Sequence, residues 1–181
     1  MLRLRSDVRL TPLALAHASD MYRWVCDPVV SRNIGLRSSP SLEKTKAWIR
    51  EALRGTSTRP FAILLDGQHV GNVVLDRIDD HICSARLSVY IGEAFARGAG
   101  VGLTAVYLAL SEGFERMALH KIWLTVHVEN LSAIRSYTKL GFVLEGILRD
   151  DFWLDAQRVA VLYMSILDHE YQRRAVVKVQ D

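Results

Sequence analysis

A glycine-rich run at residues 97–102 is the part of this chain with the clearest chemical potential. It reads Arg-Gly-Ala-Gly-Val-Gly and stands between a strand-like segment, 87–91, and a helix-like segment that begins at Leu103. Glycines let backbone N–H groups approach an anion, and the start of a helix adds the positive end of its dipole. The order strand, glycine turn, helix therefore predicts a phosphate-binding loop. It is not the nucleoside triphosphatase loop, because no Gly-Lys-Ser/Thr follows the run.

The N-terminal third of the chain is expected to supply a strand and two helices. Residues 1–10 alternate loosely and predict a first strand. Thr11 offers an N-cap with Pro12 at the first helical position, which predicts a helix to about Cys26. Residues 27–40 are read as irregular.

The second of these helices is expected to start at Ser39 or Ser41 and to stop at Gly55. Together with the irregular stretch, these helices could form a lid over a substrate.

The strands that must hold the glycine loop follow from turn and alternation signals. Asp66-Gly67 between 61–65 and 69–75 predicts a tight hairpin, since the primed turn needs positive φ. A third strand is expected at about 82–91.

After the loop, one apolar stripe predicts a helix that ends near Leu119. The remaining expected elements are a strand at 122–128, a helix at 132–140 closed by Gly141, and strands at 142–148 and 159–167. This order predicts an α+β or mixed α/β fold around one sheet, in one domain spanning 1–181.

Composition narrows the class of protein. Of the 181 residues, 50% are apolar, yet no run approaches the roughly 20 residues of a membrane span. We expect a cytoplasmic protein with no membrane partner. The two cysteines, Cys26 and Cys83, show no metal-ligand spacing, so no metal is expected. A net charge of +3 suits a phosphorylated ligand, but the basic residues are scattered, which argues against nucleic acid.

Two motifs in the right order make the chain resemble the GNAT superfamily of acyl-CoA-dependent N-acetyltransferases, over nearly the whole length. The first is Arg97-x-x-Gly100-x-Gly102, and the second is Asn130-x-x-Ala133-x-x-x-Tyr137-x-Lys139-x-Gly141-Phe142. The segment 141–146 looks most like the branch that acetylates ribosomal protein N-termini and its relatives acting on nucleotide-linked amino sugars. One departure is Asp155-Ala156 at the final hairpin, where that branch often has Asp-Gly.

The resemblance implies the acyl-CoA N-acyltransferase fold, with about four helices around a mixed, mostly antiparallel sheet that splays between two strands. It implies acetyl-CoA as cosubstrate. Backbone amides of the loop would hold the pyrophosphate, and the strand before the loop would bond the pantetheine arm as an added strand. The residues implied for the coenzyme are Val89, Tyr90, Ile91, Arg97, Gly98, Ala99, Gly100, Val101, Gly102, Leu103, Thr104, Asn130, Ser132 and Tyr137.

The transfer chemistry needs an unprotonated amine, a donor for the developing oxyanion and a proton for the departing thiolate. The resemblance places the Tyr137 hydroxyl at the sulfur, as general acid, and a backbone N–H near Val89 or Tyr90 at the oxyanion. The general base is left open, because 84–90 offers no carboxylate or imidazole where many relatives carry one. The candidates are His127, Asp76, Asp79 and Glu129.

The absence of a clear general base affects which amine is expected as the acceptor. Deprotonating a lysine-like amine at pH 7 costs about 4.6 kcal/mol, against about 1 to 1.4 kcal/mol for an α-amine. Protein N-termini or amino sugars therefore rank above lysine and polyamine nitrogens. Arg32 and Arg37 are candidates for an acceptor phosphate or carboxylate, and Trp153 for the acceptor pocket wall.

Two further readings stay open. A catalytically weak acetyl-CoA-binding sensor or interaction module is the alternative function, supported by the absent strand carboxylate. A homodimer is the possible assembly.

Overall fold

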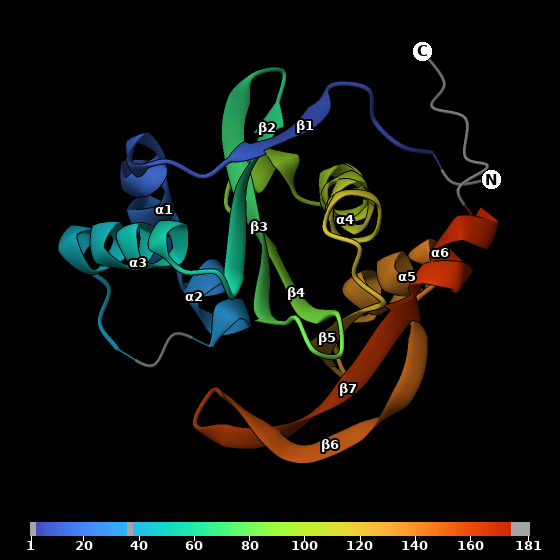
Figure 1. The fold of residues 1–181 in the computed structure, drawn as a ribbon. Coiled ribbons are helices and arrows are strands. Elements are labelled where there is room, and N and C mark those ends of the chain that lie inside the picture. The colour runs from blue at the N-terminus through green and yellow to red at the C-terminus, as the bar shows by residue number, and fades with distance from the viewer. Residues whose placement is uncertain (1–2, 36–37, 175–181) are drawn as a thin grey trace.

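One seven-stranded sheet organises the chain, in the order β1-β2-β3-β4-β5-β7-β6 (Figure 1). The computed structural model describes residues 3–35 and 38–174. The strands are β1 Val8–Pro12, β2 Thr58–Leu65, β3 Gln68–Asp79, β4 Ser84–Ile91, β5 Lys121–His127, β6 Val143–Leu154 and β7 Gln157–Leu167. The β4–β5 pair is parallel, and every other neighbouring pair is antiparallel. The mixed, mostly antiparallel sheet is therefore confirmed.

Six helices cover the two faces of this sheet, with α1–α3 on one side and α4–α6 on the other in Figure 1. They are α1 Ala18–Val25, α2 Pro28–Ile34, α3 Leu42–Arg54, α4 Val101–Ser111, α5 Leu131–Leu140 and α6 Asp168–Arg174. Each face has its own core. The larger core joins β3 and β4 to α4, while the smaller one centres on Trp24 and Ile49. The middle of β3, residues 70–75, is buried on both faces, and apart from Asn72 these residues are apolar or glycine.

The parallel pair β4–β5 separates soon after it forms. Residues Ser84–Arg86 pair with Lys121–Trp123, and no pairing of the two strands continues beyond them within the described chain. β4 nevertheless runs on to Ile91 and β5 to His127. The two strands therefore diverge and leave an open gap in the middle of the sheet, as expected.

The expected first helix start is wrong. Thr11 and Pro12 belong to β1, where Pro12 lies opposite Phe61. β1 is an edge strand, and a proline without an N–H group is tolerated there. α1 begins only at Ala18, after a short 3-10 turn.

The expected irregular stretch 27–40 is also wrong in part, because it contains α2. Asp27 is the N-cap and accepts a hydrogen bond from the Val29 N–H at 2.9 Å, with Pro28 in the first turn. That is an ordinary helix start, and the shortness of the helix hid its periodicity.

The other expected elements are present, but β3 runs on to Asp79 rather than 75, β6 runs on to Leu154 rather than 148, and there are six helices where about four were expected. Asp66 and Gly67 form the β2–β3 turn with φ of 49° and 80°, and α3 is capped by Ser41. α5 runs between its N-cap Asn130 and its C-cap Gly141. Two features were not expected: the π-turn that extends α4 through Glu112–Arg116, and α6.

Gly71 gives a stability prediction, because the backbones of β3 and β4 approach too closely there for any side chain. A Cβ at this position would lie 2.4 Å from the Tyr90 carbonyl oxygen. We expect Gly71→Ala to lower the free energy of unfolding by about 1 to 3 kcal/mol. Gly146→Ala in β6 is the matched control, since an added Cβ meets nothing within 4 Å there. Denaturant titration of both variants checks this, and equal stabilities would contradict it.

Candidate functional site

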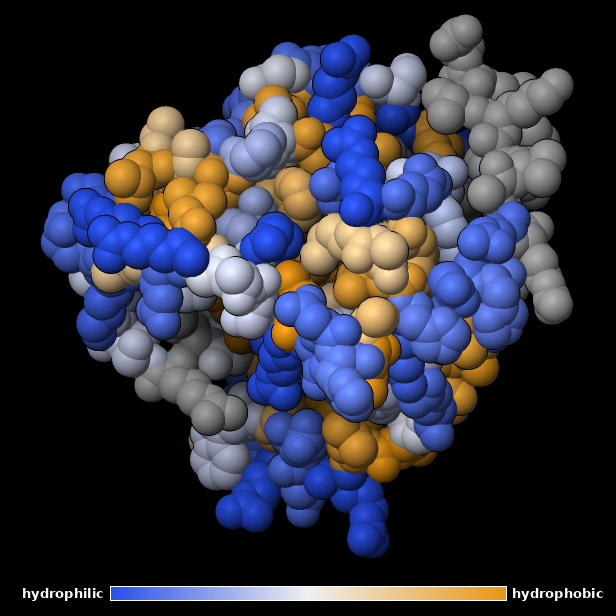
Figure 2. Space-filling model, viewed as in Figure 1, coloured by the Kyte–Doolittle hydropathy of each residue, from blue (hydrophilic) through white to orange (hydrophobic). Residues whose placement is uncertain are grey.

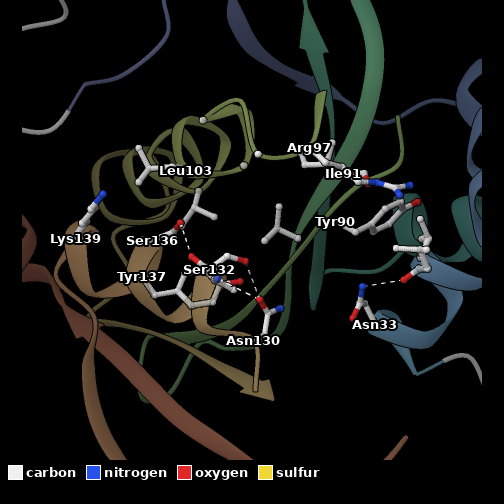
Figure 3. Close-up of a pocket in the computed structure, with 18 of the residues that line it drawn as sticks. Asn33, Tyr90, Ile91, Arg97, Leu103, Asn130, Ser132, Ser136, Tyr137 and Lys139 are labelled. Carbon is white, nitrogen blue, oxygen red and sulfur yellow. Dashed lines mark hydrogen bonds between the residues drawn. The ribbon is translucent and has the colours of Figure 1, made fainter. Parts of the chain in front are cut away.

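Two cavities meet at the gap between β4 and β5. The first, of about 930 Å³, lies between β4, the glycine loop, α5 and α2 (Figure 3). The second, of about 610 Å³, lies on the other face, beneath α1–α3 and beside the β6–β7 hairpin. Both cavities are lined by the same five residues: Asn33, Val89, Tyr90, Asn130 and Tyr137. A ligand in the first cavity can thus contact a ligand in the second cavity through this gap.

The glycine loop opens directly into the first cavity. Gly98 and Gly100 have φ of 73° and 81°, and Gly100 is the N-cap of α4. Only glycine adopts this conformation readily, and an added Cβ at Gly98 would meet nothing within 4 Å. The first-turn N–H groups of α4 have no partner inside the helix, so they are available to an anion.

Most residues expected at the coenzyme line this cavity. They are Val89, Tyr90, Ile91, Arg97, Gly98, Gly100, Gly102, Leu103, Asn130, Ser132 and Tyr137. Three expected residues do not line it: Ala99, Val101 and Thr104.

Each of these three is engaged elsewhere. The Thr104 hydroxyl is buried and accepts a hydrogen bond from the Arg5 N–H at 3.1 Å. The Ala99 carbonyl accepts one from the Arg5 guanidinium, and Val101 is fully buried in the core.

Arg97 supports the loop with its side chain. Its guanidinium donates to the Ile91 carbonyl at 3.1 Å, to the Gly92 carbonyl at 2.6 Å and to the Asp27 carboxylate at 3.0 Å. The guanidinium lowers the pKa of Asp27, which also caps α2. Arg97 therefore fastens the glycine loop to β4 and to the helix that borders both cavities.

The edge of β4 that faces the gap is open beyond Arg86. The Ile91 carbonyl is bonded by Arg97 rather than by a strand. Since alternate residues of a strand direct their backbone groups to the same side, Val89 presents its N–H and C=O to the gap as well. Of the two β4 residues expected to bond a pantetheine arm, Val89 is the one whose carbonyl Arg97 leaves available.

Asn130 and Ser132 lie at the start of α5, beside the cavity (Figure 3). The Asn130 side-chain oxygen accepts from the Ala133 N–H at 3.2 Å and from the Ser132 hydroxyl at 3.1 Å. The amide oxygen is used as the helix cap, which directs the amide NH₂ group elsewhere. The cap thereby holds Asn130 in a fixed orientation at the gap.

Sequence reasoning missed several residues of the first cavity. Arg3, Asn33, Ser136 and Lys139 line it, as do the apolar side chains Val29, Val30, Val106 and Ala133. Lys139 stands inside the second motif, one turn or less from Ser136 and Tyr137, so helical spacing could have found it. Arg3 and α2 are distant in sequence from the glycine loop, and no local sequence pattern marked them as part of the cavity.

Tyr137 lies at the junction and His127 lines the second cavity, and the two side chains have opposite protonation preferences. Burial raises the pKa of Tyr137 to about 12, so its hydroxyl stays protonated at neutral pH. Burial lowers the pKa of His127, and the nearby Arg32 adds to this, so the imidazole stays neutral. Its Nδ1 atom is buried with no hydrogen-bond partner among the described residues, and its ring stands edge-on to Phe152. A proton donor and a proton acceptor are thus both present.

The other candidate bases are less suited. Asp76 lines the second cavity, but Arg86 binds its two carboxylate oxygens at 2.8 Å and 2.7 Å. Asp79 accepts from the His81 and Ile82 N–H groups in the β3–β4 turn, and Glu129 is exposed. Neither lines a cavity.

The second cavity is closed by contacts between α2 and the β6–β7 hairpin. Arg32 pairs with Asp155 at 2.5 Å, and the Phe152 ring lies against Gly35. Arg32 is therefore committed to the hairpin, whereas Arg37 lies outside the described residues. Trp153 lines a third, outer cavity with Arg32 and not the second one.

Neither a metal cluster nor a membrane span is found in the described chain. Among residues 3–35 and 38–174, no three His, Cys, Asp or Glu side chains are grouped to hold a metal ion. No helix of this part of the chain is long and apolar enough to cross a membrane.

Comparisons of this chain with known proteins all indicate the same family. A family model described as an acetyltransferase (GNAT) domain matches residues 7–143. The spermidine N(1)-acetyltransferase of Escherichia coli K12 is 35% identical over 115 residues, which are 64% of this chain and 61% of that protein. A Bacillus subtilis protein named as a candidate ribosomal N-acetyltransferase is 24% identical over 110 residues, 61% of this chain and 60% of that one. The match thus spans about three fifths of the length of these relatives.

Solved structures show the same fold. The spermidine N-acetyltransferase of Vibrio cholerae, in complex with CoA and spermine, superposes with a TM-score of 0.87 at 25% identity, covering 93% of this chain and 99% of that one. A dodecameric structure of the Vibrio cholerae enzyme superposes with a TM-score of 0.83, also at 25% identity, covering 94% and 99%.

The lowered pKa of His127 predicts that the free energy of unfolding depends on pH. Its folded-state pKa lies below the ordinary value of 6.5, so the unfolded chain takes up the proton first. This stabilising contribution is complete above about pH 6.5 and is lost as the pH falls below it. We expect His127→Gln to flatten the decline of the unfolding free energy between about pH 7 and 5. Urea titrations across this window, referenced to pH 8, check it, and an unchanged slope would contradict it.

Proposed function

The chain belongs to the GNAT acetyltransferase family, and from that premise we propose that it transfers the acetyl group of acetyl-CoA directly to a primary amine. The observation that carries this proposal is the junction of the two cavities at Val89, Tyr90 and Tyr137. An acyl donor lying in the first cavity and an amine lying in the second would meet there.

The first cavity fits coenzyme A in both shape and charge. The glycine loop and the start of α4 offer backbone N–H groups to a pyrophosphate, and Arg3 and Lys139 line the same cavity. The open edge of β4 offers Val89 to an extended amide arm, as in strand addition. The bound coenzyme would supply an acetyl group activated as a thioester.

The residues at the junction have the properties that the transfer requires. The Val89 N–H would donate to the oxygen on which negative charge develops, a contribution of about 2.7 to 4 kcal/mol in measured oxyanion holes. Tyr137, which stays protonated, would give its proton to the departing sulfur. His127, which stays neutral, would accept the proton of the amine.

The charge of the second cavity favours an acceptor with one amine over a polyamine. Asp76 is the single carboxylate among the described residues that line it, and Arg86 already pairs with it, while Lys44 adds a positive charge. A polycation such as spermidine would have no unpaired carboxylate to bind there. We therefore rank protein α-amines and amino sugars first, although the relatives from Escherichia coli and Vibrio cholerae are named for spermidine.

Assembly as a homodimer remains part of the proposal. β6 is an edge strand, and it exposes Val143, Leu144, Ile147 and Leu148. Figure 2 shows apolar atoms at the surface over the β6–β7 strand pair. The dodecamer formed by the Vibrio cholerae relative supports self-association of this fold.

The acid assignment predicts the behaviour of Tyr137→Phe. Without the hydroxyl, kcat should fall by about 10² to 10⁴, because a positioned general acid contributes on that scale. Coenzyme affinity should stay largely intact. Tyr107→Phe on α4 is the control, since Tyr107 lies outside both cavities and packs against Tyr171. Thiol release measures the rate and calorimetry the affinity; unchanged turnover in the Tyr137 variant would remove it as the acid.

The acceptor ranking predicts the outcome of an amine panel. Alaninamide, an alanyl peptide, glucosamine and spermidine would be compared by thiol release and product mass at pH 7. We expect kcat/KM for the best of the first three to exceed that for spermidine. Arg86→Gln leaves Asp76 unpaired and should raise the relative rate with spermidine. Fastest transfer to spermidine by the unaltered protein would refute the ranking, and binding of acetyl-CoA without transfer to any amine would favour the sensor.

A further inference from the structure

Four polar side chains form a continuous hydrogen-bonded row from the surface of α1 to the second cavity. The Asp20 carboxylate lies 3.1 Å from His69 Nδ1, and His69 Nε2 lies 3.2 Å from the Asn72 side-chain oxygen. The Asn72 amide nitrogen then donates to the Tyr90 hydroxyl oxygen at 2.7 Å. Tyr90 and Asn72 both line the second cavity, and Tyr90 also lines the first.

The sheet fixes the inner half of this row. Asn72 on β3 lies directly opposite Tyr90 on β4, so their side chains share one face of the sheet. Asn72 is 1% exposed and the His69 side chain 7%, which leaves these groups little access to water. Buried polar groups of this kind must be satisfied by one another, and each bond then constrains the next.

With the Asn72 side-chain oxygen toward His69, the order of donors and acceptors along the row has one solution. A carboxylate only accepts, so His69 Nδ1 carries a proton toward Asp20. The Asn72 oxygen also accepts, so His69 Nε2 carries a proton as well. Asn72 therefore donates to the Tyr90 oxygen, and the proton of the Tyr90 hydroxyl is left for another partner. Within the described chain no such partner is present beyond Asn72.

Oxygen atoms face both ring nitrogens of His69, one from Asp20 and one from Asn72. Arg23 bonds both Asp20 and Glu93 at the surface. The His17 ring lies 4.5 Å from the His69 ring and is tilted against it, and its Nδ1 accepts from the Ala14 N–H, so that ring is neutral there. Burial lowers the pKa of His17, and the charge of His69 adds to this.

Tyr90 itself remains a donor at neutral pH. Burial raises the pKa of its hydroxyl to about 12, although the bond from Asn72 acts in the opposite direction. The O–H proton of Tyr90 has no acceptor on an ammonium group, and bonded to a neutral amine it would occupy the lone pair that the transfer needs. It is suited to an oxygen atom of the acceptor.

Building on the proposed acetyl transfer, we propose that Tyr90 is a specificity-determining residue that donates a hydrogen bond to a carbonyl or hydroxyl oxygen next to the acceptor amine. Asp20, His69 and Asn72 are positioning residues that hold the hydroxyl in the donor state. Amines that bear such an oxygen are preferred, and alkylamines and polyamines, which lack one, are not.

The test compares two acceptors of the same shape. Alaninamide carries a carbonyl beside the amine, and in 3-methylbutan-2-amine two methyl groups replace the amide oxygen and nitrogen. Tyr90→Phe should lower the ratio of kcat/KM for alaninamide to kcat/KM for the alkylamine by about 10- to 100-fold. Tyr163→Phe is the control, because Tyr163 stacks on Trp123 outside both cavities. An unchanged ratio of the two acceptors in Tyr90→Phe would overturn the proposal.

The positioning residues are tested with a graded pair of variants. His69→Leu removes the donor to Asn72 and should reduce the same selectivity ratio. His69→Gln retains an N–H donor and should restore part of it, and coenzyme affinity should not change in either. A loss of activity without a change in the ratio would show a merely structural role and would refute the positioning assignment.

Nitrogen-15 spectra of His69 provide a readout that does not depend on activity. Protons on both ring nitrogens at the pH of the assay support the donor state of Tyr90. A proton on Nδ1 alone would require the Asn72 amide to turn over, so that its oxygen accepts the Tyr90 hydroxyl proton and none is left for the acceptor, which contradicts the proposal. If no amine is acetylated by the unaltered protein, the proposed function fails, yet these spectra still decide the orientation of the row.

Discussion

The short parallel contact between β4 and β5 is the constraint on which the rest of the structure depends. Three residues of each strand pair, at Ser84–Arg86 and Lys121–Trp123, and beyond them the strands diverge. Divergence leaves backbone groups of β4 without a strand partner, and an unpaired buried backbone group is costly unless a ligand or a side chain satisfies it. The gap is therefore both the opening that joins the two cavities and a template for an extended ligand.

The side-chain contacts around the gap join segments that are far apart in the chain. Arg97 connects the glycine loop to Asp27, the cap of α2, so the loop and the helix share one anchor. Beside the second cavity, α2 also contacts the β6–β7 hairpin through Arg32 and Asp155. α2 therefore takes part in the contacts that border both cavities.

Burial is the main influence on the protonation of the side chains around the gap. It raises the pKa of Tyr137 and of Tyr90 and lowers that of His127, and each shift disfavours the charged form. The result is two neutral hydroxyl groups at the junction and a neutral imidazole in the second cavity. Asp76, by contrast, has both carboxylate oxygens bonded by Arg86.

The sequence alone determined the parts that depend on neighbouring residues. The glycine loop, the Asp66-Gly67 hairpin, α3 and α5 follow from capping, turn and periodicity signals that act over a few residues. The position of Tyr137 at the gap was implied by the resemblance to the family, which its motif carries.

Only the tertiary structure decided which side chains are free to act. Thr104 is hydrogen-bonded to Arg5, Arg97 to Asp27 and Asp76 to Arg86. Each of these bonds joins residues that are separated in the sequence. Pro12 entered a strand because the sheet places that strand at its edge. Such outcomes depend on which segments become neighbours after folding, and a local pattern carries no information about that.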